Sequence, residues 1–426
     1  MEKERGGGSA VLELCRVCLP LAAAACFAWG AWQCAVRTLF PAGPLPRVQR
    51  TLPPGLWRPA LFCLAAGALV QAVLVAYSCA QSGGAPLGQA LEIQFYGNTD
   101  ARHYIDLAQY GYGMGEDFPE QYLMIVFFPL FPWLLRLLNL FGWFDYRILA
   151  LVVQLPLFCA AGAGLYTLVC RQYDARTAWR ALVLLAVSPA AVFYFAPMTE
   201  SLFLALTVWY VWCLQSGRWG RAALLGALAG LTRAPGGLLC GLAFLYLLQQ
   251  ARAQKKAPPP AAAAAVLGPA AGLGLYFALN QAVYGRWDQY SVYQWEHWNQ
   301  KLGLFTDTIR YHLAYFAGWW HSDRDTAVWL CLTAVVCILA AFALLAAAAR
   351  RLPPAWLGYG LAYLLVTMGA TWLLSAPRYA VALFCLPVAL AVLLRGRRAL
   401  TVCTVAVLLA CSAAYTAVWL GHGPIY

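Results

Sequence analysis

The chain has 426 residues, of which 62% are hydrophobic and only 11% are charged, with a formal net charge of +12 and a mean hydropathy of +0.64. Apolar runs of roughly 20 residues recur, each long enough to cross a hydrocarbon core of about 30 Å, which argues against a soluble protein and indicates a polytopic membrane protein. The basic residues lie in short links between these runs, where positive charge marks the cytoplasmic side. We therefore expect the lipid bilayer as a partner and no nucleic acid.

In chain order, the apolar runs predict membrane-spanning helices at residues 11–39, 61–79, 148–170, 177–195, 201–215, 261–283, 326–349, 356–374, 379–394 and 400–420. Segment 222–248 is too short for two full crossings and is interrupted by Thr232-Arg-Ala-Pro-Gly-Gly237. We expect two re-entrant half-helices there, tolerated where protein or water shields the backbone, which places Arg233 at membrane depth. Residues 1–426 then form one all-α domain with about eleven crossings plus the half-helices.

The basic links fix the predicted orientation, because Lys and Arg concentrate on the cytoplasmic side. They lie near residues 37–58, 171–180, 218–221, 252–256, 350–351 and 395–398. The two longest polar loops, 81–121 and 284–325, carry most of the acidic residues. These loops fall on the opposite, non-cytoplasmic side, where we expect the active-site face.

This orientation leaves room for only one crossing between residues 122 and 170. The run Phe127-Phe-Pro-Leu-Phe-Pro132 contains two prolines and is followed by Arg136 and an aromatic stretch that ends at Phe144. We therefore predict that residues 122–141 form an interfacial helix on the outer face, and that residues 148–170 cross.

The most polar stretch is Gly97-Asn-Thr-Asp-Ala-Arg-His-Tyr-Ile-Asp106, which leads into a predicted amphipathic helix at residues 101–110. Asp100 has two interpretations, a helix N-cap or a carboxylate that acts as general base for an acceptor hydroxyl. His103 and Tyr104 follow on the same helix face. Asp106 should point elsewhere and is a secondary candidate.

Three further charged residues flank apolar helices. Glu200 precedes the span at 201–215, where it either caps the helix or marks a site. Arg233 and Arg378 are costly at membrane depth, and their guanidinium groups suit a lipid-linked phosphate. Their alternative roles are snorkelling to lipid head groups or pairing with Glu200.

The aromatic residues of loop 284–325 either stack on sugar rings and cover the site or anchor the chain at the membrane interface. The acids and histidines of the outer loops show no spacing typical of a metal-ligand set. We therefore expect neither a metal ion nor another cofactor.

The order of the motifs resembles that of the PIG-V-like mannosyltransferases of the GT-C superfamily over residues 96–398. The motifs are Asp100 with a following Tyr-Ile-Asp-Leu-Ala-Gln-Tyr-Gly-Tyr, then Phe-Phe-Pro-Leu-Phe-Pro, Thr-Glu-Ser-Leu-Phe, Gly-Leu-Thr-Arg-Ala-Pro-Gly and Pro-Arg-Tyr. The resemblance implies a GT-C fold that moves mannose, with inversion, from a polyprenyl-phosphate carrier to a lipid- or glycan-linked acceptor on the non-cytoplasmic face. It also maps the family's first-loop acid onto Asp100.

Such a transfer needs a base and a phosphate clamp, for which we assign Asp100 and either Arg233 or Arg378. The secondary candidates are His103, Tyr104, Asp106 and Glu200. The alternative function is a transporter or flippase for a lipid-linked saccharide, with Glu200, Arg233 and Arg378 along its path. A transporter buries polar groups near the midplane, whereas this chain gathers them on one face, which favours sugar transfer.

Short links and the excess of arginine over lysine favour a bacterial plasma membrane, with the endoplasmic reticulum as the eukaryotic alternative.

Overall fold

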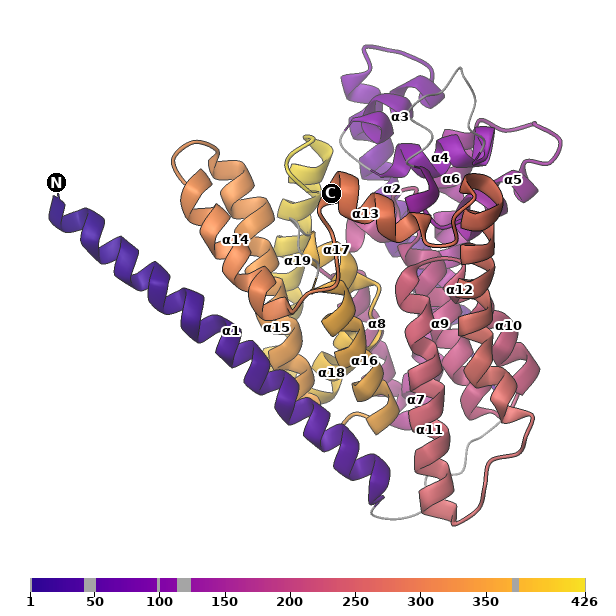
Figure 1. Ribbon diagram of the computed structural model, residues 1–426. Coiled ribbons are helices and arrows are strands. Elements are labelled where there is room, and N and C mark those ends of the chain that lie inside the picture. The colour runs from indigo at the N-terminus through magenta and orange to yellow at the C-terminus, as the bar shows by residue number, and fades with distance from the viewer. Residues whose placement is uncertain (1, 42–50, 98–99, 113–123, 370–374, 426) are drawn as a thin grey trace.

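The computed structural model describes residues 2–41, 51–97, 100–112, 124–369 and 375–425, and the regular elements in these ranges are all helical (Figure 1). Among the described residues, seven helical segments are long and apolar enough to cross a membrane. They lie in α1 (Glu2–Leu39), α2 (Trp57–Gln81), α6 with α7 (Tyr146–Val152 and Gln154–Gln172), η3 with α11 (Ala234–Leu238 and Leu239–Gln254), α12 (Ala262–Tyr284), η4 with α15 (Thr326–Leu332 and Thr333–Ala348) and α19 (Arg398–Leu420). The predicted all-α, polytopic membrane fold is confirmed.

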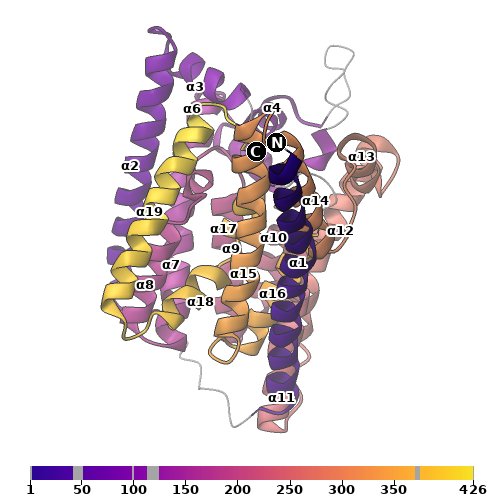
Figure 2. The same ribbon diagram turned by 90° about the vertical axis from the view of Figure 1, so that its left-hand side faces the viewer.

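The outermost helices lie at the edges of the helical body. The long helix α1 contacts α14 (Phe305–Trp319), α15 and α16 (Pro354–Thr367) along one side (Figures 1 and 2). The helices α2 and α19 both pack against α8 (Ala175–Ala186), and α2 also contacts α7. Leu69 of α2 and Val402 of α19 remain exposed, as expected for side chains that face lipid.

Several predicted crossings are shorter than expected because their helices break inside the body. These helices are α8, α16 and the pair α17 (Ala376–Val381) and α18 (Cys385–Leu393). By contrast, α9 (Glu200–Gln215) matches the span predicted at 201–215, and a single turn of 3₁₀ helix, η2 (Ala191–Tyr194), lies between α8 and α9. Continuous helices over residues 177–195 and 379–394 are therefore wrong predictions. Pro189 interrupts the first of these ranges, and Pro387, which has no backbone N–H, lies in the first turn of α18. Part of the span predicted at 356–374 lies outside the described residues.

The predicted interruption of segment 222–248 is confirmed. Helix α10 (Trp219–Gly230) ends before Arg233, and the short η3 leads from there into α11. The backbone N–H of Leu130 donates to the Leu231 carbonyl oxygen (3.1 Å), which pairs one backbone group freed by the break. Arg233 itself has extended backbone angles and stands at the N-cap position of η3.

Short helices gather at one end of the body. They are α3 (Leu87–Tyr96), α4 (Ala101–Tyr110), α5 (Leu130–Leu138) and α13 (Gln289–Trp298) (Figure 1). The bounds of α4 confirm the helix predicted at residues 101–110. The 9 residues of α5 extend only about 14 Å, so the run predicted as interfacial does not cross, although its helix is shorter than 122–141. Phe141 and Trp143 follow α5, stack on each other and are exposed.

Arginine side chains tie helix ends together at the opposite end. Arg37 donates to the carbonyl oxygens of Ala349 (2.5 Å) and Leu352 (2.9 Å), beyond the end of α15. Arg395 pairs with Asp174 at 3.0 Å, between the links that precede α19 and α8. These contacts place basic links from distant parts of the sequence at one end, and they pair helix-terminal carbonyl groups that would otherwise lack donors.

Helix α10, which ends at this break, packs closely against α12. A side chain at Gly272 would overlap the carbonyl oxygen of Ala227, and one at Gly268 would overlap that of Ala223. Pro269 of α12 also lies against Gly226 of α10. The small residues thus let the two backbones approach closely, as is common for helices packed within membranes.

We expect Gly272→Ala to destabilise the protein by about 1–3 kcal/mol, because the added methyl group must push α10 away from α12. Gly274→Ala is the matched control in the same helix, since nothing lies within 4 Å of the position that its added methyl group would take. Thermal unfolding in detergent should give a lower midpoint for Gly272→Ala only. Equal midpoints for the two variants would contradict a tight α10–α12 contact.

Candidate active site

Asp100 immediately precedes α4, but its side chain makes no capping hydrogen bond to that helix. Its Oδ2 instead accepts from Nη1 of Arg378, which lies in α17. The Asp100 side chain is 36% exposed, whereas that of Arg378 is only 7% exposed. The N-cap interpretation of the Asp100 carboxylate is therefore wrong, and this group belongs to an ion pair between residues far apart in the sequence.

Glu200 is the first residue of α9 and is fully buried. Its Oε1 accepts from Nη1 of Arg233 at 2.7 Å and from Nε of Arg378 at 3.0 Å. The second carboxylate oxygen, Oε2, is buried without a hydrogen-bond partner. The alternative that the sequence left open for the two arginines, pairing with Glu200, is thus what the structure contains.

Asp100, Glu200, Arg233 and Arg378 form one connected network, which we call the charged network. Its two carboxylates and two guanidinium groups balance in charge, as buried ionic groups in an apolar body require. Each arginine also makes a cation–π contact. The Arg233 guanidinium lies 5.4 Å from the Tyr379 ring centroid, and that of Arg378 lies 5.6 Å from the Phe193 ring centroid.

Polar side chains hold the broken backbone around the charged network. Ser201 Oγ donates to the Tyr194 carbonyl oxygen (2.6 Å), and Gln154 Nε2 donates to that of Met198 (2.9 Å). Tyr194 Oη in turn donates to the carbonyl oxygen of Val381 at 2.6 Å. These bonds join the break before α9 to the end of α17, so they fix the positions of Glu200 and Arg378 relative to each other.

Gln154 and Tyr194 do not stand out in the sequence. Each lies in an apolar run and resembles an ordinary buried side chain, and each donates to a carbonyl group that a helix break has freed. A polar residue opposite a proline-rich break is the signal that would have indicated them.

His103 and Tyr104 of α4 both contact the Phe127-Phe-Pro motif, which their spacing did not predict. The His103 ring stacks on Phe127 with centroids 4.6 Å apart, and Tyr104 meets Phe127 and Phe131 edge-on at 5.3 and 5.8 Å. The motif therefore packs against α4. It positions the helix that follows Asp100.

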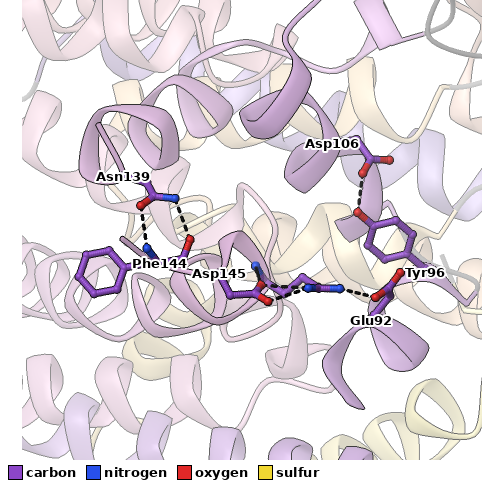
Figure 3. A network of polar contacts seen from close by, with 7 residues as sticks. Glu92, Tyr96, Asp106, Asn139, Phe144 and Asp145 are labelled. Atoms are coloured by element: carbon purple, nitrogen blue, oxygen red, sulfur yellow. Dashed lines mark hydrogen bonds and ion pairs between the residues drawn. The ribbon is translucent and has the colours of Figure 1, made fainter. Parts of the chain in front are cut away.

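Asp106 lies outside the charged network, as its place on the helix predicted. Its carboxylate accepts from Tyr96 Oη, next to a separate group in which Arg147 pairs with Glu92 and Asp145 (Figure 3). Burial raises the pKa of Asp106, and the hydrogen bond from Tyr96 offsets only part of that effect. This second group joins α3, α4 and the start of α6.

The segment predicted as a polar loop at 284–325 is largely helical, and α13 brings one aromatic residue toward the charged network. Tyr290 contacts Phe128 and Tyr276 with ring centroids 5.8 and 5.9 Å apart, and its backbone N–H donates to Oδ1 of the buried Asn280 (2.9 Å). Trp287 is exposed. The segment thus holds both a packed aromatic residue and an exposed one.

Within the described ranges, no three His, Cys, Asp or Glu side chains come together in a way that could hold a metal ion. The charges of the site are provided instead by the two guanidinium groups and the two carboxylates.

Burial acts to raise the pKa of Asp100, but the charge of Arg378 and its hydrogen bond outweigh burial and hold the pKa below its ordinary value. A carboxyl group with a lowered pKa stabilises the fold above its unfolded pKa of about 3.9 and loses that contribution as the pH falls through the folded value. We expect a contribution of about 1 kcal/mol or less, because Asp100 is partly exposed.

The measurement is the difference in unfolding midpoint between wild type and Asp100→Asn in detergent. It should stay constant from pH 7 to pH 5 and shrink below about pH 4. A difference of equal size at pH 7 and pH 3 would contradict the ion pair.

Comparison with known proteins gives a family match over part of the chain. Residues 64–255 match the family described as mannosyltransferase (PIG-V), a range that includes Asp100, Glu200 and Arg233. A search of curated proteins found no match to the chain. Of the two functions that the sequence left open, the match supports an enzyme rather than a transporter. Over residues 64–255 the chain is similar to the PIG-V mannosyltransferases, and this match together with the apolar helices supports an integral membrane glycosyltransferase.

Proposed function

We propose that the protein moves mannose from a polyprenyl-phosphate carrier to a hydroxyl of a lipid- or glycan-linked acceptor, with inversion at the anomeric carbon. The observation that carries the proposal is the charged network, which combines a partly exposed carboxylate with two buried guanidinium groups. The family match supports the sugar and the reaction class.

The proposed chemistry is a single displacement. The acceptor oxygen loses its proton to a base and bonds to the anomeric carbon, while the bond from that carbon to the carrier phosphate breaks. We assign Asp100 as the base, since its side chain is 36% exposed and that of Glu200 is fully buried. Only Asp100 is open to an acceptor hydroxyl without a rearrangement of α9.

The leaving phosphate gains negative charge as the bond to the sugar breaks, so positive groups around it favour the transition state. Arg233 and Arg378 are the proposed donors, because a guanidinium group binds phosphate oxygens through two N–H groups at once. Both are held by the same oxygen of Glu200, which keeps them side by side. In this proposal no step depends on a metal ion.

We place the reaction on the non-cytoplasmic face. The short helices that carry Asp100 gather at one end of the body, and the arginine-rich links gather at the other. Positive charge favours the cytoplasmic side, so loops 81–121 and 284–325 face away from it. We infer a bacterial plasma membrane as the location, on the composition of the links.

The first test is Asp100→Asn, which keeps the size of the side chain but removes its ability to take a proton. We expect the variant to fold and to lose about 10²- to 10⁴-fold in transfer rate. Asp106→Asn is the matched control in the helix that follows Asp100, because Asp106 contacts Tyr96 and lies outside the charged network. The assay is transfer from polyprenyl-phosphate mannose to a membrane glycolipid extract by purified protein. Near-normal transfer by Asp100→Asn would remove Asp100 from the role of base.

The second test is Arg233→Lys, which keeps the charge but loses the two-point contact with phosphate. We expect the kcat/KM for the donor to fall by roughly tenfold or more, with a smaller change for the acceptor. Initial rates with each substrate varied in turn measure the two constants. Kinetics equal to wild type for both substrates would return Arg233 to a purely structural role.

A further inference from the structure

The two partners of Arg378 differ sharply in exposure. Asp100 accepts from Nη1 and is 36% exposed, whereas Glu200 accepts from Nε and is fully buried. An anion that arrives from the surroundings therefore reaches the Asp100 side of the guanidinium group first. The Glu200 side is closed to it.

We propose that Glu200 is a positioning residue that anchors both arginines, and that the phosphodiester of the donor competes with Asp100 for Arg378. The inference rests on the proposed function, because it takes the lipid-linked phosphate as the ligand of the two arginines. Donor binding then releases the Asp100 carboxylate, so the base becomes available only when the sugar is in place.

The geometry of Glu200 suits an anchor. A single oxygen, Oε1, accepts from both arginines at 2.7 and 3.0 Å, and Oε2 has no partner. Neither guanidinium group therefore makes a two-point contact with Glu200, which leaves N–H groups of each for another anion. Since Glu200 begins α9 and is enclosed, it keeps Arg378 compensated when the bond to Asp100 is exchanged for a bond to phosphate.

Hydrogen bonds fix the backbone near Glu200, whereas the side chain of Asp100 is less constrained. Ser201, next to Glu200, bonds the Tyr194 carbonyl oxygen, and Tyr194 bonds that of Val381 beyond Arg378. Asp100 makes no capping hydrogen bond to α4, so its side chain can leave Arg378 without loss of a helix cap.

The test is equilibrium binding of farnesyl phosphate, a short prenyl phosphate, to purified protein in detergent. Asp100→Asn should bind it roughly fivefold more tightly, the scale of one partly exposed ion pair, because a competitor is removed. Glu200→Asp keeps the charge but draws the anchor back by one methylene, and it should bind roughly tenfold more weakly. Asp145→Asn, an acid paired with Arg147 in the separate group, is the control and should bind like wild type.

A second variant covers poor folding of Glu200→Asp. Glu200→Gln keeps the side-chain length, and it should also weaken binding if Glu200 positions the arginines. If charge alone matters, Glu200→Asp binds like wild type and Glu200→Gln binds more tightly, and that pair of results would overturn the inference. Weaker binding by Asp100→Asn would overturn the competition.

Failure of the proposed function would give different results from failure of this inference. Wild type that does not bind farnesyl phosphate refutes the lipid-phosphate donor and, with it, this inference. Unchanged sugar transfer by Asp100→Asn refutes the assignment of the base, but leaves the opposite effects of the Asp100 and Glu200 variants on binding as predicted.

Discussion

The structure depends on the pairing of two buried arginines with one buried glutamate. Arg233 and Arg378 come from different helix breaks and meet at a single oxygen of Glu200. Leaving either guanidinium group uncompensated in an apolar body would cost about 3–5 kcal/mol, the penalty for breaking a buried ion pair. Helices α9 and α17 and the turn before η3 must therefore keep their relative positions. The partly exposed carboxylate of Asp100 provides the second negative charge.

The breaks in the helices and the charged network explain each other. Glu200, Arg233 and Arg378 all lie at or next to a point where a helix ends inside the body. Side chains of an uninterrupted helix point sideways from its axis, whereas a break lets side chains from different helices meet. The break also leaves backbone groups that need hydrogen-bond partners. Gln154, Tyr194 and Ser201 provide those partners. Non-helical backbone at membrane depth is tolerated where the protein pairs it in this way, and it commonly marks a binding site.

Local patterns in the sequence predicted the features that depend on local physics. The bounds of α4 and the interruption near Arg233 follow from amphipathic spacing and from proline and glycine. The breaks after α8 and α17 were missed because apolar content hides them in a hydropathy profile. The partner of Asp100 was also missed: Arg378 lies 278 residues away, and only the packed fold brings the two together. A short acid before a helix matches an N-cap equally well, so the sequence could not separate the two roles.

In the proposed reaction, the charged network receives the phosphate of the donor and presents the sugar to Asp100. The most direct measurement of this role is a cryo-electron microscopy structure with a non-hydrolysable phosphonate analogue of polyprenyl-phosphate mannose bound. We expect the phosphonate group against Arg233 and Arg378, the mannose ring on the side of Asp100, and Arg378 still in contact with Glu200. Density for the phosphonate group at the opposite, arginine-rich end of the body, with the charged network unchanged, would contradict this role.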